Sequence, residues 1–187
     1  MGKAYKNFWS LNTDEAVVVG ILRDITPKNI EVLMPANAQM KDIDLVLMNL
    51  KNRKSLTMQV KGSRAFEPRK SEVIKHGDGS AGWFMLNFDT IFKNTADYFI
   101  FLIYVLEENK KAGRRIISHH TITIPTKEIQ LLTKKFKKVG KTKMFNFLIW
   151  INPYKKISFE FRDKEFDLSK YLDAKGLEKL NEKLNDT

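Results

Sequence analysis

The sequence has no cysteine, three histidines and five prolines among its 187 residues. Without cysteine, the chain holds no disulfide framework, no thiolate zinc site and no cysteine nucleophile. Its longest unbroken apolar run, Tyr98 to Leu106, has nine residues, far fewer than the ~20 that a membrane-spanning helix needs. The first residues also lack the basic, apolar and small-residue pattern of a secretory leader. We therefore expect a soluble cytoplasmic protein.

Acidic residues are scarce relative to basic ones, with 22 Asp and Glu against 33 Lys and Arg, so the formal net charge is +11. The excess lies in the middle of the chain: residues 62–163 carry +9, residues 1–61 carry +3 and residues 164–187 carry −1. Such a field favours a polyanionic partner, because each phosphate that a protein neutralises releases condensed counterions. Nucleic acid is the expected partner, and charge that serves only solubility is the alternative.

Apolar residues make up 43% of the chain, which is enough for a buried core and excludes global disorder. The length suits one domain. The run 98–106 has no polar alternation and predicts a central strand covered on both faces. Residues 62–82 predict a long loop, and 83–97 a short strand or a helix. Helices are expected at 11–24, 127–138 and 168–184, and further strands at 30–34, 43–48, 56–61, 118–124, 144–151 and 156–161. This order predicts an α/β (α+β) domain with a mixed sheet flanked by helices.

Three polar residues on two neighbouring predicted strands form the sharpest local pattern. If the connecting turn centres between Lys51 and Asn52, antiparallel pairing places Asp44 opposite Gln59. Lys61 follows Gln59 by two residues and projects from the same face. A carboxylate, an amide and an ammonium group then converge. Oxygen ligands of this kind suit Mg²⁺, and a nearby lysine can orient an attacking water.

The motif Asp44, fourteen residues, then Gln59-Val60-Lys61 on the next strand resembles the PD-(D/E)XK nuclease superfamily, which has the restriction-endonuclease-like fold. The likeness is greatest to the branch with Asp…Gln-X-Lys and a glutamate on the preceding helix, as in some homing endonucleases and small prokaryotic nucleases. Glu15 matches that glutamate. Segments 97–101 and 121–125 resemble the later core strands. The resemblance covers residues 8–135 in outline and leaves 136–187 as an accessory hairpin and C-terminal helix.

The resemblance implies DNA as substrate and phosphodiester hydrolysis with Mg²⁺, for which Mn²⁺ could substitute. It implies that Asp44 ligates the metal, Gln59 supplies an amide oxygen, Lys61 orients the water and stabilises charge, and Glu15 binds the metal directly or through water. The pattern departs from the family at two positions. Ile43 stands where a proline usually precedes the aspartate, and Gln59 replaces the second carboxylate. Asp42 has the same strand parity as Asp44 and is the competing ligand.

Basic residues around this motif predict a nucleic-acid-binding surface. Ser63 and Arg64 follow Lys61 by two and three residues, in a glycine-containing loop that could border the scissile phosphate. Residues 134–143 hold six lysines in ten positions, enough to contact several phosphates. These are Lys134, Lys135, Lys137, Lys138, Lys141 and Lys143.

The three histidines point to no catalytic arrangement. His119 and His120 are adjacent on a predicted strand and project to opposite faces, which argues against shared metal ligation. We expect them, with His76, to be structural or surface residues, and the sequence suggests no Ser/His/Asp arrangement.

Two other functions compete with the nuclease hypothesis. The first is a module of the same fold that binds DNA without cleaving it, and the second is a basic protein that meets acidic protein or RNA. Many enzymes of the superfamily dimerise to cut both strands, so the resemblance is compatible with a homodimer. The predicted C-terminal helix, with Leu177, Leu180 and Leu184 on one face, either packs at such an interface or, as is more common, covers the sheet.

Overall fold

The structure is a computed structural model that describes residues 13–35, 42–63, 66–109, 113–137, 143–162 and 166–186. Within these ranges, no helix is both long and apolar enough to cross a membrane. The elements follow in the order α1 (Thr13–Ile25), β1 (Ile30–Leu33), β2 (Leu45–Asn49), β3 (Ser55–Gly62), α2 (Lys70–His76), β4 (Ser80–Asn87), α3 (Phe88–Lys93), β5 (Tyr98–Asn109), β6 (Arg114–Pro125), α4 (Thr126–Lys137), β7 (Met144–Asn152), β8 (Ile157–Glu160), the 3₁₀ turn η1 (Ser169–Tyr171) and α5 (Ala174–Asn185).

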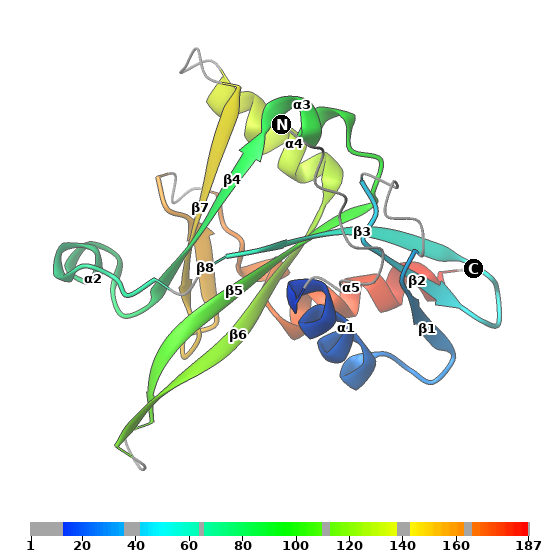
Figure 1. The fold of residues 1–187 in the computed structure, drawn as a ribbon, viewed down its shortest axis with the longest axis horizontal. Coiled ribbons are helices and arrows are strands. Elements are labelled where there is room, and N and C mark those ends of the chain that lie inside the picture. The colour runs from blue at the N-terminus through cyan, green and yellow to red at the C-terminus, as the bar shows by residue number, and fades with distance from the viewer. Residues whose placement is uncertain are drawn as a thin grey trace, which may run out of the picture.

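The strands form two sheets, and the larger is mixed. Its order is β1-β2-β3-β5-β6, and the second sheet has the order β4-β7-β8. In the larger sheet β3 and β5 are parallel, whereas the other neighbouring strands are antiparallel. The class is therefore α+β, with a mixed sheet flanked by helices (Figure 1).

Each face of the larger sheet is covered by its own hydrophobic layer. On one face, Val18 and Leu22 of α1 and Leu180 of α5 pack against strand residues such as Met58 and Ile100. On the other face, the second sheet and helices α3 and α4 cover strand residues that include Phe99, Phe101, Ile103 and Ile122. Strand β5 contributes to both layers because its successive side chains alternate between the faces. This two-sided burial is what the apolar run at 98–106 predicts.

Most predicted elements are present, and the largest difference lies in residues 62–97. The segment expected to be a loop contains α2 and the start of β4, and the following segment holds both the rest of β4 and α3. The alternating burial along β4 is a strand pattern, with small residues at its first three positions, Ser80, Ala81 and Gly82. Those residues carry little hydrophobic signal, so composition alone indicates a loop. The predicted helix over 168–184 begins later, at Ala174, after η1.

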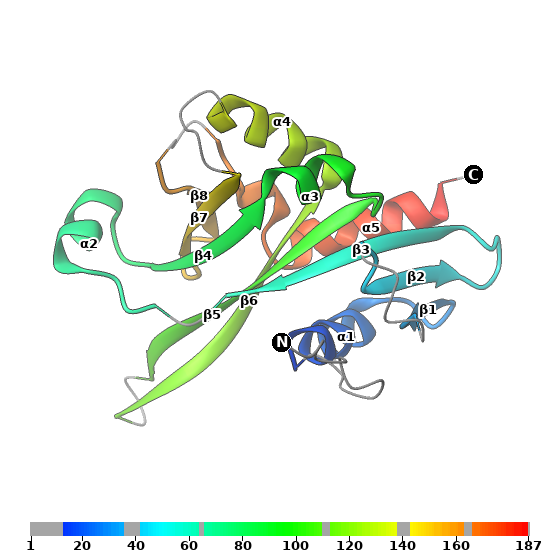
Figure 2. The same cartoon turned by 45° about the horizontal axis from the view of Figure 1, so that its top comes forward.

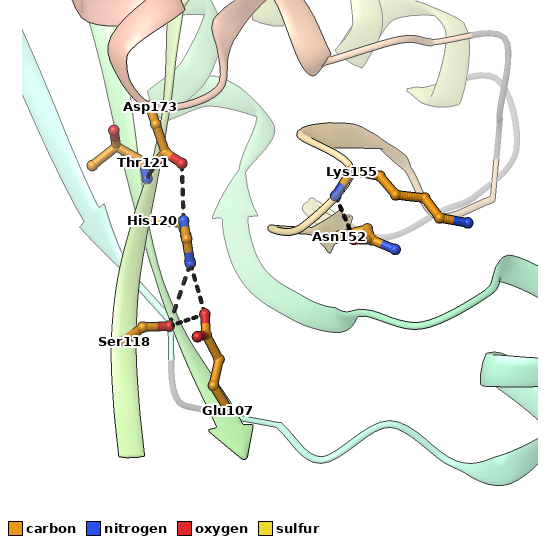
Figure 3. Close-up of polar contacts among 7 residues, drawn as sticks. All are labelled: Glu107, Ser118, His120, Thr121, Asn152, Lys155 and Asp173. Carbon is orange, nitrogen blue, oxygen red and sulfur yellow. Dashed lines mark hydrogen bonds and ion pairs between the residues drawn. The ribbon is translucent and has the colours of Figure 1, made fainter. Parts of the chain in front are cut away.

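The predicted C-terminal hairpin forms, and its turn covers residues 153–156, because Asn152 still pairs with Ile157 at the end of β7. The Oδ1 atom of Asn152 accepts a hydrogen bond of 2.9 Å from the backbone N–H of Lys155 (Figure 3). Strand β7 also pairs along its length with β4, from Ser80↔Ile151 to Asn87↔Met144. The hairpin therefore shares a sheet with a strand from the first half of the chain.

Strands β5 and β6 extend well beyond the body of the larger sheet. Strand β3 pairs with β5 only as far as Gly62↔Leu102, whereas β5 and β6 remain paired to Asn109↔Arg114. Residues 103–109 and 114–120 thus form a two-stranded ribbon, which we call the β5–β6 arm. Both views show it projecting from the molecule (Figures 1 and 2).

Candidate functional site

Asp44 and Gln59 are in contact, as the hairpin spacing predicts. The last ladder pair between β2 and β3 is Leu45↔Met58, and this register places Asp44 beside Gln59. The Nε2 atom of Gln59 donates a short hydrogen bond to Oδ2 of Asp44. The backbone N–H of Val60 donates to the same oxygen at 2.7 Å. The Asp44 carboxylate therefore satisfies a strand N–H of β3 at the point where β2 and β3 separate.

Asn94 fixes the orientation of the Gln59 amide. The backbone N–H of Ala96 donates to Oδ1 of Asn94 at 2.9 Å, so the amide nitrogen of Asn94 faces the other way. That nitrogen donates to Oε1 of Gln59 at 3.2 Å, which leaves Nε2 of Gln59 to point at Asp44. Gln59 is only 2% exposed. The Gln59 oxygen, which the sequence predicts to be a metal ligand, thus accepts a hydrogen bond from Asn94 instead. Gln59 contributes to the site by orienting the Asp44 carboxylate.

Lys61 lies on the same face of β3 as Gln59. Their partners across the parallel ladder are Phe101 and Phe99, which face the layer covered by the second sheet. Beyond Met58, strand β3 has no ladder partner in β2. The half-buried Lys61 side chain therefore stands two residues beyond Gln59, where the sheet opens.

Asp14, a residue that sequence reasoning did not single out, lies against the end of β3. A Cβ atom built on Gly62 would be 1.9 Å from Oδ2 of Asp14, so only glycine lets the carboxylate come this close to the strand. The Tyr104 hydroxyl donates to Oδ1 of Asp14 at 2.9 Å. Burial, together with this hydrogen bond and the charge of Asp14, raises the pKa of Tyr104 to about 12. The two neighbours mark Asp14 as an anchored carboxylate.

Glu15 and Asp42 occupy different surroundings from Asp44. Glu15 is half-buried in the first turn of α1, the helix that packs on the opposite face of the sheet from Gln59. Asp42 precedes the strand, and Asp44 is the residue that contacts Gln59 and Val60. Of the two candidate aspartates, Asp44 is thus the one that lies beside Gln59, as the hairpin register predicts.

Ser63 is buried at the end of β3 and links this strand to β4. Its hydroxyl accepts a hydrogen bond of 3.0 Å from the backbone N–H of Trp83, and its own N–H donates to the carbonyl of Leu102 at 2.9 Å. The predicted contact between Ser63 and a phosphate stays a prediction. Arg64 lies outside the described residues.

The predicted lysine surface is described in part. Lys134 and Lys135 near the end of α4, and Lys143 before β7, are exposed. Helix α4 begins beside Ala96, whose carbonyl accepts from the Thr126 hydroxyl at 2.5 Å. A helix of 12 residues is about 18 Å long, and Lys134 and Lys135 lie in its C-terminal half, away from the end beside Ala96. Lys138, Lys141 and the side chain of Lys137 lie outside the described residues.

A divalent cation needs several oxygen ligands close together. No group of three or more His, Asp and Glu side chains in the described part of the chain is placed to hold a metal ion. Among the described residues, both hydrogen bonds that the Asp44 carboxylate accepts use Oδ2, and its Oδ1 is a hard oxygen donor. Mg²⁺ commonly binds through one or two carboxylates together with water and substrate phosphates. The described residues thus offer one carboxylate oxygen here, and a cation bound to it would need water and substrate phosphates as its other ligands.

A second polar cluster joins the β5–β6 arm to the start of α5 (Figure 3). Nδ1 of His120 lies 2.9 Å from Oδ2 of Asp173, and Nε2 lies 3.3 Å from both Oε1 of Glu107 and Oγ of Ser118. The Ser118 hydroxyl donates to Glu107 at 2.6 Å. The structure thus brings Ser118, His120 and Asp173 together, a proximity that the sequence does not predict.

In this cluster a protonated His120 forms ion pairs with Asp173 and Glu107. Because the Ser118 proton goes to Glu107, His120 sits between two carboxylates and can donate to both only when it is protonated. Burial alone would lower the pKa of His120, but the hydrogen bonds and charges of Asp173 and Glu107 outweigh burial and raise that pKa. We call this group of Glu107, Ser118, His120 and Asp173 the His120 clasp.

Comparisons of the chain with protein-family models, curated proteins and solved structures give no match.

Proposed function

We propose that this protein is a Mg²⁺-dependent DNA endonuclease with a restriction-endonuclease-like core. The observation that carries the proposal is the Asp44 carboxylate, which Gln59 and the N–H of Val60 hold where β2 and β3 separate. Lys61 lies on the same face, two residues along β3. The net charge of +11 supports DNA as the ligand.

In this proposal each residue has one task. Asp44 would bind the cation through Oδ1, while Gln59 and Asn94 keep its carboxylate in position. Bound Mg²⁺ would activate water and offset phosphate charge. Lys61 would orient the attacking water and stabilise the negative charge that develops on the phosphate oxygens. The oxygen of the water would bond to phosphorus and lose a proton to solvent, the bridging P–O bond would break, and the leaving oxygen would take up a proton from solvent. Glu15 and Asp14 lie on α1, which packs on the opposite face of the sheet from Gln59, and they have no task at this cation.

The test is cleavage of a supercoiled plasmid with Mg²⁺ or Mn²⁺ beside an EDTA control. We expect metal-dependent nicking or linearisation, with loss of at least about a hundredfold in rate in Asp44→Ala and Lys61→Ala. Asp42→Ala is the matched control, because it removes a neighbouring carboxylate that does not hold the Gln59 contact. Full cleavage by Asp44→Ala, or equal loss in Asp42→Ala, would contradict the assignment.

One observation favours a second function, a DNA-binding module without catalysis. Gln59 replaces a carboxylate and its oxygen accepts from Asn94, so the site has less negative charge for a cation than two carboxylates would give. This function predicts a plasmid gel shift that weakens with salt, no cleavage with either metal, and the same affinity in Asp44→Ala as in the wild type.

A further inference from the structure

We propose that the β5–β6 arm is a DNA-binding element that enters the major groove beside the candidate site. This inference rests on the proposed function only in taking DNA as the ligand. It assigns a contact surface that the nuclease residues do not include.

The arm begins at the candidate site. Its base is Leu102, which pairs with Gly62 and accepts a hydrogen bond of 2.9 Å from the N–H of Ser63. From Ile103 to Asn109 strand β5 pairs with β6 and gains no further partner from β3. Seven residues at the rise of a strand span roughly 20 Å. A duplex bound with a phosphate near Lys61 would therefore lie within reach of the arm.

The composition of the arm suits a polyanion. Residues 103–120 hold four basic residues, Lys110, Lys111, Arg114 and Arg115, against two acidic ones, Glu107 and Glu108, and Glu107 is engaged by Ser118 and His120. Further in, Ile116 and Ile117 are 44% and 65% exposed, and His119 is also exposed. Apolar side chains on a ribbon can contact thymine methyl groups, and the basic residues can bind phosphates.

The shape of the arm also fits this ligand. The major groove of B-form DNA is about 12 Å wide and admits a two-stranded β-ribbon. A second copy of this chain is the competing occupant for the exposed isoleucines. A net charge of +11 on each copy disfavours bringing two basic arms against another basic body, whereas DNA complements the charge.

The His120 clasp holds the arm at a defined angle to the body. Asp173, the N-cap residue of α5, has a positive φ of 46°. Its Oδ1 atom accepts from the N–H of Thr121 at 2.8 Å, and its Oδ2 atom binds His120. Glu107 continues the contact onto the other strand of the arm. A ribbon fixed in this way loses less conformational entropy when it binds than a free one would.

The absence of cysteine allows a direct test by single-cysteine crosslinking. Ile117→Cys carries a photo-crosslinker on the arm, and Tyr154→Cys carries the same group on the exposed β7–β8 turn, where Tyr154 is 73% exposed. Each protein is irradiated with a labelled DNA duplex in EDTA, so that cleavage plays no part. We expect crosslinks to DNA from the arm position and at least about tenfold fewer from the turn. Equal yields from both positions, or a protein–protein crosslink from Ile117→Cys in place of a DNA crosslink, would overturn the proposal.

A charge variant gives an independent measurement. The double substitution Arg114→Ala/Arg115→Ala should lower the slope of log affinity against log salt by about two, since each phosphate contact contributes about 0.9. Lys155→Ala/Lys156→Ala removes the same charge from the β7–β8 turn and should leave the slope unchanged. Equal changes in both variants would mean that only overall charge matters, and would overturn the proposal. If the wild type cleaves DNA but the arm variant binds normally, this inference fails and the nuclease proposal stands. If the wild type binds DNA through the arm but does not cleave it, the nuclease proposal fails and this inference stands.

Discussion

The amide of Asn94 holds the amide of Gln59, with 3.2 Å between Nδ2 of Asn94 and Oε1 of Gln59. Both side chains are buried, and Asn94 stands at the C-terminal cap of the short helix α3. The orientation of Asp44 on β2 therefore depends on a residue that comes 35 positions after Gln59 in the chain. This dependence gives two predictions.

Gln59→Glu should make the stability of the protein depend on Mg²⁺. The introduced carboxylate can still accept from Asn94, but its other oxygen would face Oδ2 of Asp44, where Gln59 now donates. Two like charges at this distance disfavour the state in which both are ionised. We expect an unfolding temperature a few degrees below that of the wild type in EDTA, with recovery when Mg²⁺ is added.

The control for this variant is the exchanged pair Asp44→Asn/Gln59→Glu. It contains one carboxylate and one amide, as the wild type does, so we expect near wild-type stability in EDTA and little response to Mg²⁺. If Gln59→Glu unfolds at the same temperature with and without Mg²⁺, no cation is bound between these positions. Thermal unfolding followed by circular dichroism measures all the differences.

Asn94→Ala should destabilise the fold more than removal of an ordinary helix cap. The substitution leaves the N–H of Ala96 and Oε1 of Gln59 without their partners in a buried region, at a cost of about 1–3 kcal/mol for each group. Asn87→Ala removes the N-cap of the same helix, where the side chain accepts from the N–H of Asp89, and should cost about 1 kcal/mol. Urea unfolding of the two variants gives the comparison, and an equal or smaller loss in Asn94→Ala would contradict the proposed network.

The features that can be predicted from the sequence are those that depend on one helix, one strand or one hairpin. The turn between β2 and β3 lies between two alternating strands, so its centre determines the register and brings Asp44 beside Gln59. Helix α1 and strand β5 follow in the same way from periodicity and from an unbroken apolar run. In each case the signal lies within one element or one hairpin.

The contacts that sequence reasoning missed join residues far apart in the chain. Asp173 binds His120 across 53 positions, and β4 pairs with β7, which begins 57 residues after the last residue of β4 (144 against 87). The start of β4 consists of small residues, which do not show the apolar alternation of a strand in the sequence. It becomes a strand because β7 pairs with it. Asp14 differs from Glu15 by one position in the same helical turn, and only the packing of α1 against Gly62 distinguishes the two.

Gly62→Ala should weaken the hydrogen bond between the Tyr104 hydroxyl and Asp14 and so lower the pKa of Tyr104. The new methyl group would overlap the Asp14 carboxylate, which would have to move and would weaken its hydrogen bond from the Tyr104 hydroxyl. The pKa of Tyr104, raised to about 12 in the wild type, should then fall toward 10. Ultraviolet titration of tyrosinate, with Tyr104→Phe to assign the signal, measures the change.

Gly20→Ala is the matched control for Gly62→Ala. No atom lies within 4 Å of the methyl group that it adds on α1, so it should stabilise the helix by about 0.5–1 kcal/mol and leave the tyrosine titration unchanged. A Gly62→Ala protein with an unaltered Tyr104 titration would show that Asp14 can move without losing this hydrogen bond.

The His120 clasp should make folding stability fall as the pH rises above the ordinary histidine pKa of 6.5. The pKa of His120 is raised in the folded protein: burial opposes the charge, but Asp173 and Glu107 outweigh it. The folded state therefore binds the proton more tightly than the unfolded chain does. The stabilisation is complete below the unfolded-state pKa and is lost as the pH rises through the folded-state pKa. Above that pH, Nε2 no longer donates to Glu107. Urea unfolding of the wild type across this range should show the decline.

His120→Gln should remove this pH-dependent part of the stability, because glutamine keeps a polar side chain without a titrating group. His119→Gln, a change of the exposed neighbour on the opposite face of β6, should retain the wild-type decline. Asp173→Asn removes one of the two carboxylates and should lower the pKa of His120, so its decline should begin at a lower pH. If His120→Gln loses stability with rising pH as steeply as the wild type does, the decline comes from other groups and the clasp is not its cause.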